Sequence, residues 1–199
     1  MPWVYEQAER TGRGARDVRY PPDLGPAEGN SEVMTSTIAR RAPVLTALAI
    51  DPAELDEIRR SGRDTAGNAP VLWPDATGSP LRCCLRRARP DDEVLLVSYA
   101  PLRHRSAWRE VGPVFVHARP CEGWAEDSGL PPELREGPRV LRGYREDGSL
   151  DYSAICVVQE GEDIEQPLQE LLADPAVHEV HVRALAAQCF AYRVRAVDR

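Results

Sequence analysis

Two short stretches of the chain carry the titratable side chains that are best placed to do chemistry. His117 ends one apolar run and is followed by Cys121, while His181 and Arg183 lie in a second apolar run that leads to Cys189. Both runs have the composition of buried strands, and burying an imidazole, guanidinium or thiol costs free energy unless a partner pairs with it. These positions therefore need either a structural partner or a function.

An arginine-rich loop at residues 100–112 precedes the first of these runs. Guanidinium groups bind carboxylates and phosphates through paired hydrogen bonds, so such a loop is suited to an anionic ligand. We expect a single pocket between this loop and the last two strands, which holds a small anionic molecule or a segment of a partner. Its expected residues are Arg109, Glu110, His117, Cys121, His181, Arg183 and Cys189.

Two other functions are compatible with the same residues. In the first, the protein is an enzyme in which His117 acts as a general acid or base and a thiol, from Cys121 or Cys189, is a nucleophile or a metal ligand. In the second, the domain is purely structural and has no small-molecule site. The sequence does not decide whether catalysis occurs.

A metal site and a cofactor site are not predicted. Cysteine and histidine are the usual zinc ligands, but the chain has no C-x-x-C pair. Cys83 and Cys84 are adjacent within an expected strand at 81–88, where neighbouring side chains point to opposite faces, so at most one of them should join a given site. Glycine-rich phosphate-binding loops and dinucleotide fingerprints are absent from the sequence, so no cofactor is expected.

Composition excludes further classes of protein. The formal net charge of -7 argues against a nucleic-acid partner, which would require a basic surface. The sequence has no apolar stretch long enough to span a bilayer and no secretory signal pattern, so we expect no membrane association. Five cysteines are an odd number without a secretory context, which predicts reduced thiols and a cytoplasmic protein. The oligomeric state is left open.

The chain divides into an N-terminal extension and one folded domain. Residues 1–33 are rich in glycine and proline and have no apolar periodicity, so we expect this extension to be disordered. Residues 44–199 are expected to form a single α+β domain. Its first helix should begin at Pro52, with Asp51 as the N-cap, and should end at Gly62.

Strands dominate the rest of the expected domain. They are predicted at 44–50, 81–88, 93–99, 113–118, 139–145, 150–158, 177–183 and 189–197, with a second helix at 165–172 and a loop at 64–80. Asp147 and Gly148 predict a type I′ hairpin between two of these strands. With few helices and many hairpins, the predicted fold is α+β: a curved, mostly antiparallel sheet with one or two helices packed on one face.

Five segments of the chain resemble an uncharacterised bacterial family, domain of unknown function 1203. They are PLRCCLR at 80–86, LLVSY at 95–99, WREVGPVFVH at 108–117, HVR at 181–183 and the following Cys189. The resemblance spans about residues 44–197. It implies a stand-alone cytoplasmic protein with no assigned activity, cofactor or catalytic residue, so it implies an architecture and no mechanism.

Overall fold

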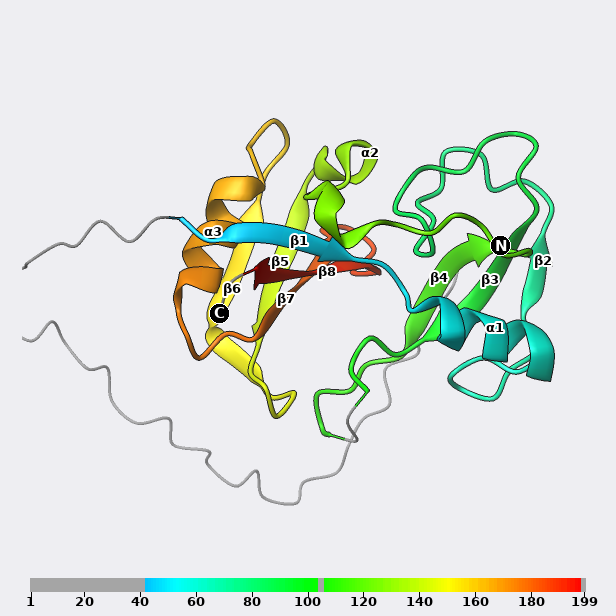
Figure 1. Ribbon diagram of the computed structural model, residues 1–199, viewed down its shortest axis with the longest axis horizontal. Coiled ribbons are helices and arrows are strands. Elements are labelled where there is room, and N and C mark those ends of the chain that lie inside the picture. The colour runs from blue at the N-terminus through cyan, green and yellow to red at the C-terminus, as the bar shows by residue number, and fades with distance from the viewer. Residues whose placement is uncertain (1–41, 104–105, 198–199) are drawn as a thin grey trace, which may run out of the picture. The chain divides into compact units, whose positions relative to one another are not determined.

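The computed structural model describes residues 42–103 and 106–197 (Figure 1). Within these ranges the chain forms eight strands in two antiparallel sheets, together with three α-helices. The predicted α+β class is confirmed. The strands divide between a five-stranded and a three-stranded sheet, whereas the sequence suggested one curved sheet. The predicted extension at 1–33 lies outside the described residues.

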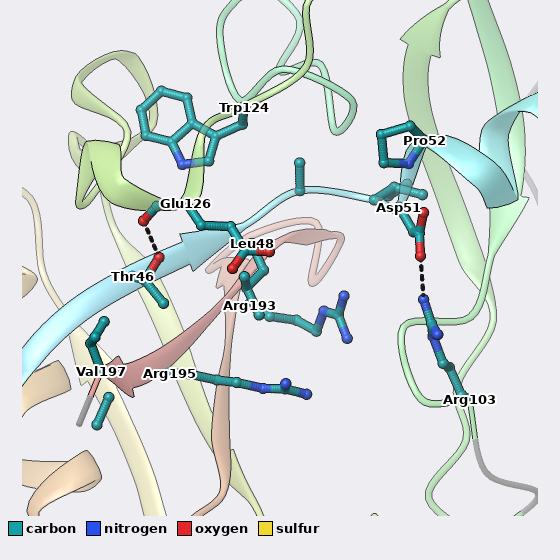
Figure 2. Close-up of a pocket in the computed structure, with 13 residues that line it drawn as sticks. Thr46, Leu48, Asp51, Pro52, Arg103, Trp124, Glu126, Arg193, Arg195 and Val197 are labelled. Carbon is teal, nitrogen blue, oxygen red and sulfur yellow. Dashed lines mark hydrogen bonds and ion pairs between the residues drawn. The ribbon is translucent and has the colours of Figure 1, made fainter. Parts of the chain in front are cut away.

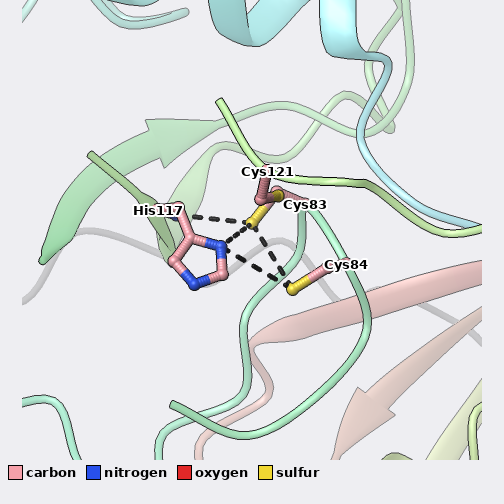
Figure 3. Close-up of side chains that lie close together, drawn as sticks. All are labelled: Cys83, Cys84, His117 and Cys121. Atoms are coloured by element: carbon pink, nitrogen blue, oxygen red, sulfur yellow. Dashed lines mark hydrogen bonds between the residues drawn. The ribbon is translucent and has the colours of Figure 1, made fainter. Parts of the chain in front are cut away.

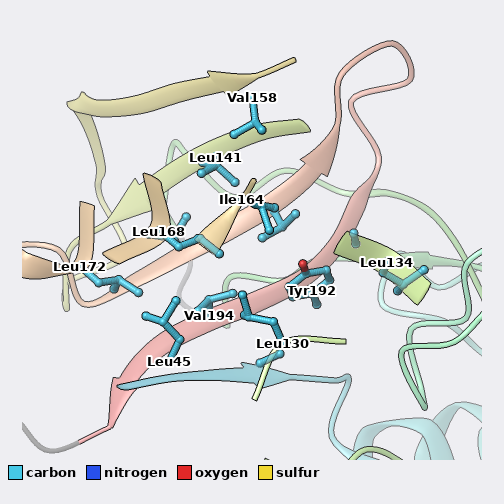
Figure 4. Packing of buried hydrophobic residues seen from close by; sticks show 14 of the residues in the cluster. Leu45, Leu130, Leu134, Leu141, Val158, Ile164, Leu168, Leu172, Tyr192 and Val194 are labelled. Atoms are coloured by element: carbon cyan, nitrogen blue, oxygen red, sulfur yellow. The ribbon is translucent and has the colours of Figure 1, made fainter. Parts of the chain in front are cut away.

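The five-stranded sheet carries the larger apolar core. Its order is β1 (Val44–Leu48), β8 (Phe190–Val197), β7 (Glu179–Ala184), β5 (Arg139–Tyr144) and β6 (Leu150–Val158), and each strand is antiparallel to its neighbours. Helix α3 (Glu165–Ala173) packs against all five strands. Leu168 and Leu172 lie one helical turn apart and are fully buried, in one cluster with Tyr192 and Val194 of β8 (Figure 4). The predicted helix and strands of this region are therefore confirmed.

The hairpin between β5 and β6 is present, but its turn is not type I′. Gly148 has a φ of 78°, whereas Asp147 is not among the described residues of positive φ. A type I′ turn needs positive φ at both central positions. Asp147 instead accepts a hydrogen bond from the backbone N–H of Ser149 at 2.9 Å, an Asx turn that holds this residue in another conformation.

The smaller sheet has the order β2 (Val71–Trp73), β3 (Val94–Tyr99) and β4 (Gly112–His117). Helix α1 (Pro52–Ser61) begins as predicted, with the Asp51 carboxylate accepting from Ala53 N–H, and ends at Gly62 with a φ of 65°. Leu55 and Ile58 of α1 share an apolar cluster with the buried residues of β3 and β4. The strand β2 is a short, exposed edge strand within the predicted 64–80 loop.

Three further features connect the two sheets. The segment between β4 and β5 contains a 3-10 turn (Glu126–Ser128) and helix α2 (Pro132–Arg135), neither of which was predicted. Phe190 of β8 belongs to the apolar cluster of the smaller sheet, and the buried Arg82 donates from Nε to the Phe190 carbonyl at 2.8 Å.

In the described part of the chain, no helix has both the length and the apolar character needed to cross a membrane.

Candidate functional site

Four side chains with metal-binding atoms meet beside the smaller sheet. They are Cys83, Cys84, His117 and Cys121, and the three sulfur atoms and one ring nitrogen all lie within 4.8 Å of one another (Figure 3). His117 ends β4, Cys121 follows it in an exposed loop, and the two adjacent cysteines come from the segment between β2 and β3. We call these four residues the Cys/His cluster.

The adjacent cysteines face the same side because their segment is a tight turn. The Leu81 N–H donates to the Arg86 carbonyl at 2.8 Å, and the Leu85 N–H donates to the Leu81 carbonyl at 3.0 Å. Leu85 has a φ of 53°, and its buried side chain anchors the turn. The predicted strand at 81–88 is therefore wrong, and so is the inference that only one of the two cysteines could join a site.

Three separations within the cluster, among the donor atoms of Cys83, Cys84 and His117, agree with a tetrahedral zinc shell. Zn–S bonds of about 2.3 Å and a Zn–N bond of about 2.0 Å require an S···S separation of about 3.8 Å and an S···N separation of about 3.5 Å. Cys83 Sγ lies 3.9 Å from Cys84 Sγ. The His117 Nδ1 lies 3.3 Å from Cys83 Sγ and 3.8 Å from Cys84 Sγ. These distances lie within about 0.3 Å of the tetrahedral values, which is a small adjustment for side chains.

The far nitrogen of the His117 ring contacts two charged groups. Its Nε2 lies 3.3 Å from Asp92 Oδ1 and 2.9 Å from Arg86 Nη2. Arg86 and Asp92 also form a paired salt bridge with distances of 2.6 and 3.0 Å. A histidine that binds zinc usually donates its other N–H to a carboxylate, which fixes the ring and makes its free nitrogen a better ligand. Asp92 is in position to accept that proton.

The tautomer of His117 separates two uses of the cluster. If Nε2 carries the proton and donates to Asp92, the Nδ1 lone pair faces the three sulfurs and can bind a metal. If Nε2 accepts from Arg86, which can only donate, Nδ1 carries the proton and can donate to a thiolate of the cluster. The first state is a metal site, and the second is a thiolate–imidazole pair.

The pKa values of the three thiols in the cluster depend on the hydrogen bonds between them. The Cys83 thiol donates toward Cys121, and the pKa of Cys121 therefore falls to about 4, with further help from the Gly123 N–H and from His117. The contact with Cys83 also lowers the pKa of Cys84, whereas the donation to both neighbours and its burial raise the pKa of Cys83. Thiolates are the form that binds metals and attacks electrophiles. Cys121, which is exposed, is the thiol most readily deprotonated in the cluster.

Three of the other predicted site residues lie elsewhere. Glu110, Arg183 and Cys189 line a separate cavity of about 320 Å³, together with Arg142. The Glu110 carboxylate accepts from Arg142 Nη1 at 2.9 Å and pairs with Arg183 Nη2. The cations of this cavity thus already have a carboxylate of the chain as partner.

The last two predicted residues make local contacts. The His181 ring is fully buried beside Tyr144 and Phe190, and its Nε2 lies 2.8 Å from Glu179 Oε1. Burial lowers the pKa of His181 despite this contact. Arg109 donates from Nε to the Leu102 carbonyl at 3.2 Å. The seven residues expected in one pocket are thus distributed among the Cys/His cluster, the Glu110 cavity and these local contacts.

Sequence reasoning missed the roles of Cys84, Arg86 and Asp92. A usable signal was present in residues 80–90, where prolines begin and end the segment and arginines interrupt any alternation of apolar residues. That pattern favours a turn over a strand. A turn removes the objection that two adjacent cysteines must face apart.

Fold and site together define an α+β protein whose smaller sheet carries a cluster of three cysteines and one histidine. The family described as Protein of unknown function (DUF1203) matches residues 78–196, more than half of the chain. The chain therefore belongs to this family, as its sequence segments indicated, and the match includes the whole Cys/His cluster. Comparison with curated proteins and with solved structures gives no match.

Proposed function

We propose that this chain is a zinc-binding protein and that Cys83, Cys84, His117 and Cys121 are the four zinc ligands. The observation that supports the proposal is that these four donor atoms all lie within 4.8 Å of one another, with those of Cys83, Cys84 and His117 at near-tetrahedral separations. Zinc sites that use four protein ligands are structural, whereas catalytic sites keep a position open for water or substrate. The proposed role of the metal is therefore to hold the domain together.

The donor set favours zinc over the hard divalent cations. Magnesium and calcium bind oxygen ligands, and the three sulfurs of the cluster exclude them as natural occupants. Thiolates with one imidazole suit zinc, and they also suit copper(I), which is soft. Stoichiometry measured for several metals in one sample distinguishes these two.

Zinc at this position would join three segments that are far apart in the sequence. The turn at 81–86, the end of β4 and the loop that holds Cys121 each contribute at least one ligand. The described residues of the chain contain no disulfide, and all five cysteines are free thiols. Where a region has a small core, a bound metal contributes folding free energy directly.

Metal content of the purified chain tests the proposal. After dialysis against metal-free buffer, elemental analysis should give about one zinc per chain for the wild type. Cys84→Ser and His117→Gln should each lose most of this zinc. Cys156→Ser is the matched control, because Cys156 is a half-buried thiol on β6 outside the cluster, and it should keep the metal.

Two results would contradict a zinc site. One is wild-type protein that contains no zinc after purification and does not bind added zinc. Such protein would also fail to give the visible spectrum of a tetrahedral thiolate complex when cobalt(II) is added. The other is a Cys84→Ser variant with unchanged zinc content.

The enzyme alternative uses the same atoms and predicts a different measurement. In a thiolate–imidazole pair, Cys121 would react rapidly with iodoacetamide whether or not a chelator is present. With zinc bound, alkylation of Cys121 should be slow and should accelerate when a chelator is added. Fast alkylation that is insensitive to chelator and zinc would favour the nucleophile.

A further inference from the structure

A second hollow lies where the β1–β8 edge of the larger sheet meets the start of α1 (Figure 2). Its volume is about 610 Å³, which is within the range of about 300–1,000 Å³ typical of small-molecule sites. Arg103, Arg193 and Arg195 line this hollow, and the same three residues line a smaller hollow of about 80 Å³. We call the larger one the arginine cavity.

Two of these arginines share one counterion. Arg193 and Arg195 are two residues apart on β8, so their side chains leave the same face of the strand, and Figure 2 shows them extending in the same direction. Glu179 Oε2 lies 2.7 Å from Arg195 Nη2 but 3.8 Å from Arg193 Nη1. The other oxygen of Glu179 is occupied by His181 at 2.8 Å.

This arrangement leaves Arg193 without a good partner. It makes no hydrogen bond to any residue in 42–103 or 106–197 through its side chain, although that side chain is only 12% exposed. Arg103, in contrast, is paired with Asp51 and with Glu54. Arg193 and Arg195 therefore share one carboxylate, and the hydrogen-bond donors of the Arg193 side chain remain available to a ligand.

The remaining wall of the cavity defines the rest of the ligand. The half-buried Trp124 presents apolar surface to the cavity, whereas Leu48 and Ile50 in the same lining are almost fully buried. Glu126 also lines the cavity, and its carboxylate would repel an anion, which confines the charged end of a ligand to the Arg193 side. Because Asp51 and Glu126 both line the cavity, a phosphate dianion would meet more repulsion there than a singly charged carboxylate.

We propose that the arginine cavity binds a small organic carboxylate, whose charged group bridges Arg193 and Arg195 and whose apolar body packs against Trp124. This site is independent of zinc binding. It lies between the 100–112 loop and the last strands, where an anion pocket was expected, but its arginines are other than the expected ones. A guanidinium pair holds a planar carboxylate through parallel hydrogen bonds, and an apolar wall favours ligands with an aromatic or aliphatic body.

Titration with benzoate tests the proposal on the whole chain. Wild-type protein should bind benzoate saturably below about 10 mM, as measured by calorimetry and by the fluorescence of Trp124. Arg193→Gln should weaken binding at least tenfold. Arg60→Gln removes the same charge from an exposed position on α1 and should bind like the wild type. Trp124→Phe should remove the fluorescence response.

Each outcome of this titration decides the proposal. Absence of saturable binding by the wild type, or equal weakening by Arg193→Gln and Arg60→Gln, would overturn it. Phenyl phosphate that binds as tightly as benzoate would overturn the carboxylate assignment. If Arg193→Gln does not fold, Arg193→Lys replaces it, since lysine keeps the charge but not the planar pair of donors. Weaker benzoate binding by that variant supports the proposal, and unchanged binding contradicts it.

Discussion

The two sheets of this protein differ in what holds them together. The five-stranded sheet is covered by α3 and encloses a continuous cluster of fully buried leucine, isoleucine and valine side chains. The three-stranded sheet has an exposed edge strand, β2, and long irregular connections on both sides of β3. Its cluster also uses a cysteine, Cys83, as a core residue. The apolar cluster of the larger sheet has 17 buried residues and that of the smaller sheet 13, so we expect the smaller region to gain more from a bound metal.

The buried polar groups of the two regions follow the same division. In the larger sheet, Glu179 is paired with His181 and Arg195, so its charge is balanced by the chain itself. In the smaller sheet, three thiols converge on His117, which a metal would organise better than hydrogen bonds alone. Under the proposed function, the smaller region depends on a bound metal, whereas the charges of the larger region are balanced by its own side chains.

Removal of zinc should have the largest effect, and it should be confined to the smaller sheet. With free zinc at about a thousand times its Kd, loss of the metal costs about 4 kcal/mol of unfolding free energy. For a chain of this size that corresponds to about 10 °C in Tm. Hydrogen exchange with and without chelator should show faster exchange in β3 and β4 and little change in β5 and β7. Uniform acceleration in both sheets would remove the distinction between them.

Leu168→Ala should have the next largest effect, and its effect should not depend on metal. Leu168 is fully buried between α3 and the larger sheet, and truncating such a leucine costs about 3 kcal/mol through lost burial and the cavity left behind. Urea unfolding should give the same loss in zinc-containing and zinc-free buffer. A loss that appears only when zinc is present would show that the two regions unfold as one metal-dependent unit.

Glu179→Gln should have the smallest effect, and it should disappear in acid. Burial raises the pKa of Glu179, but His181, Arg195 and Arg193 outweigh burial and lower this pKa from 4.5 to about 2. A carboxyl group with a lowered pKa stabilises the folded state above its unfolded pKa, and this contribution is lost as pH falls through the folded pKa. The free energy of unfolding of the wild type should therefore exceed that of the variant by about 2 kcal/mol at neutral pH. The partial hydration of Arg195 limits the size of this difference.

The difference between the two proteins should hold down to about pH 5 and vanish near pH 2. Urea unfolding of both proteins over this pH range measures it. Since both lose zinc alike in acid, the metal does not contribute to the difference. A difference that grows with falling pH would contradict the assigned direction of the pKa change.

The sequence predicts the larger sheet well because its patterns are local. Leu168 and Leu172 repeat with helical spacing, and Tyr192 and Val194 alternate with Arg193 and Arg195 as a strand with one apolar face requires. Phe190 was expected on the same face, but a register shift between β7 and β8 places it in the apolar cluster of the smaller sheet. The capping signals at Asp51 and Gly62 also specify the first helix correctly. In each case one short segment contains the whole signal.

The Cys/His cluster could not be predicted in the same way because it depends on contacts between distant segments. Cys83 and His117 are 34 residues apart, and their approach requires a turn that is stabilised by backbone hydrogen bonds rather than by a side-chain pattern. The arginine cavity is similar, since Arg193 has only a long ion pair with Glu179, whose two oxygens also contact Arg195 and His181. Such an imbalance is visible only when all the neighbours are in place.

The left-handed backbone of Leu85 has a consequence for anyone who would transplant the cysteine pair to another scaffold. This conformation is costly for a residue with a side chain, and glycine would adopt it more easily. Glycine, however, would leave the apolar volume that Leu85 fills empty. Position 85 therefore needs both a left-handed backbone and an apolar side chain that fills the core. A graft that copied the cysteines without this leucine and the apolar surface around it would reproduce the sequence of the motif but not its geometry.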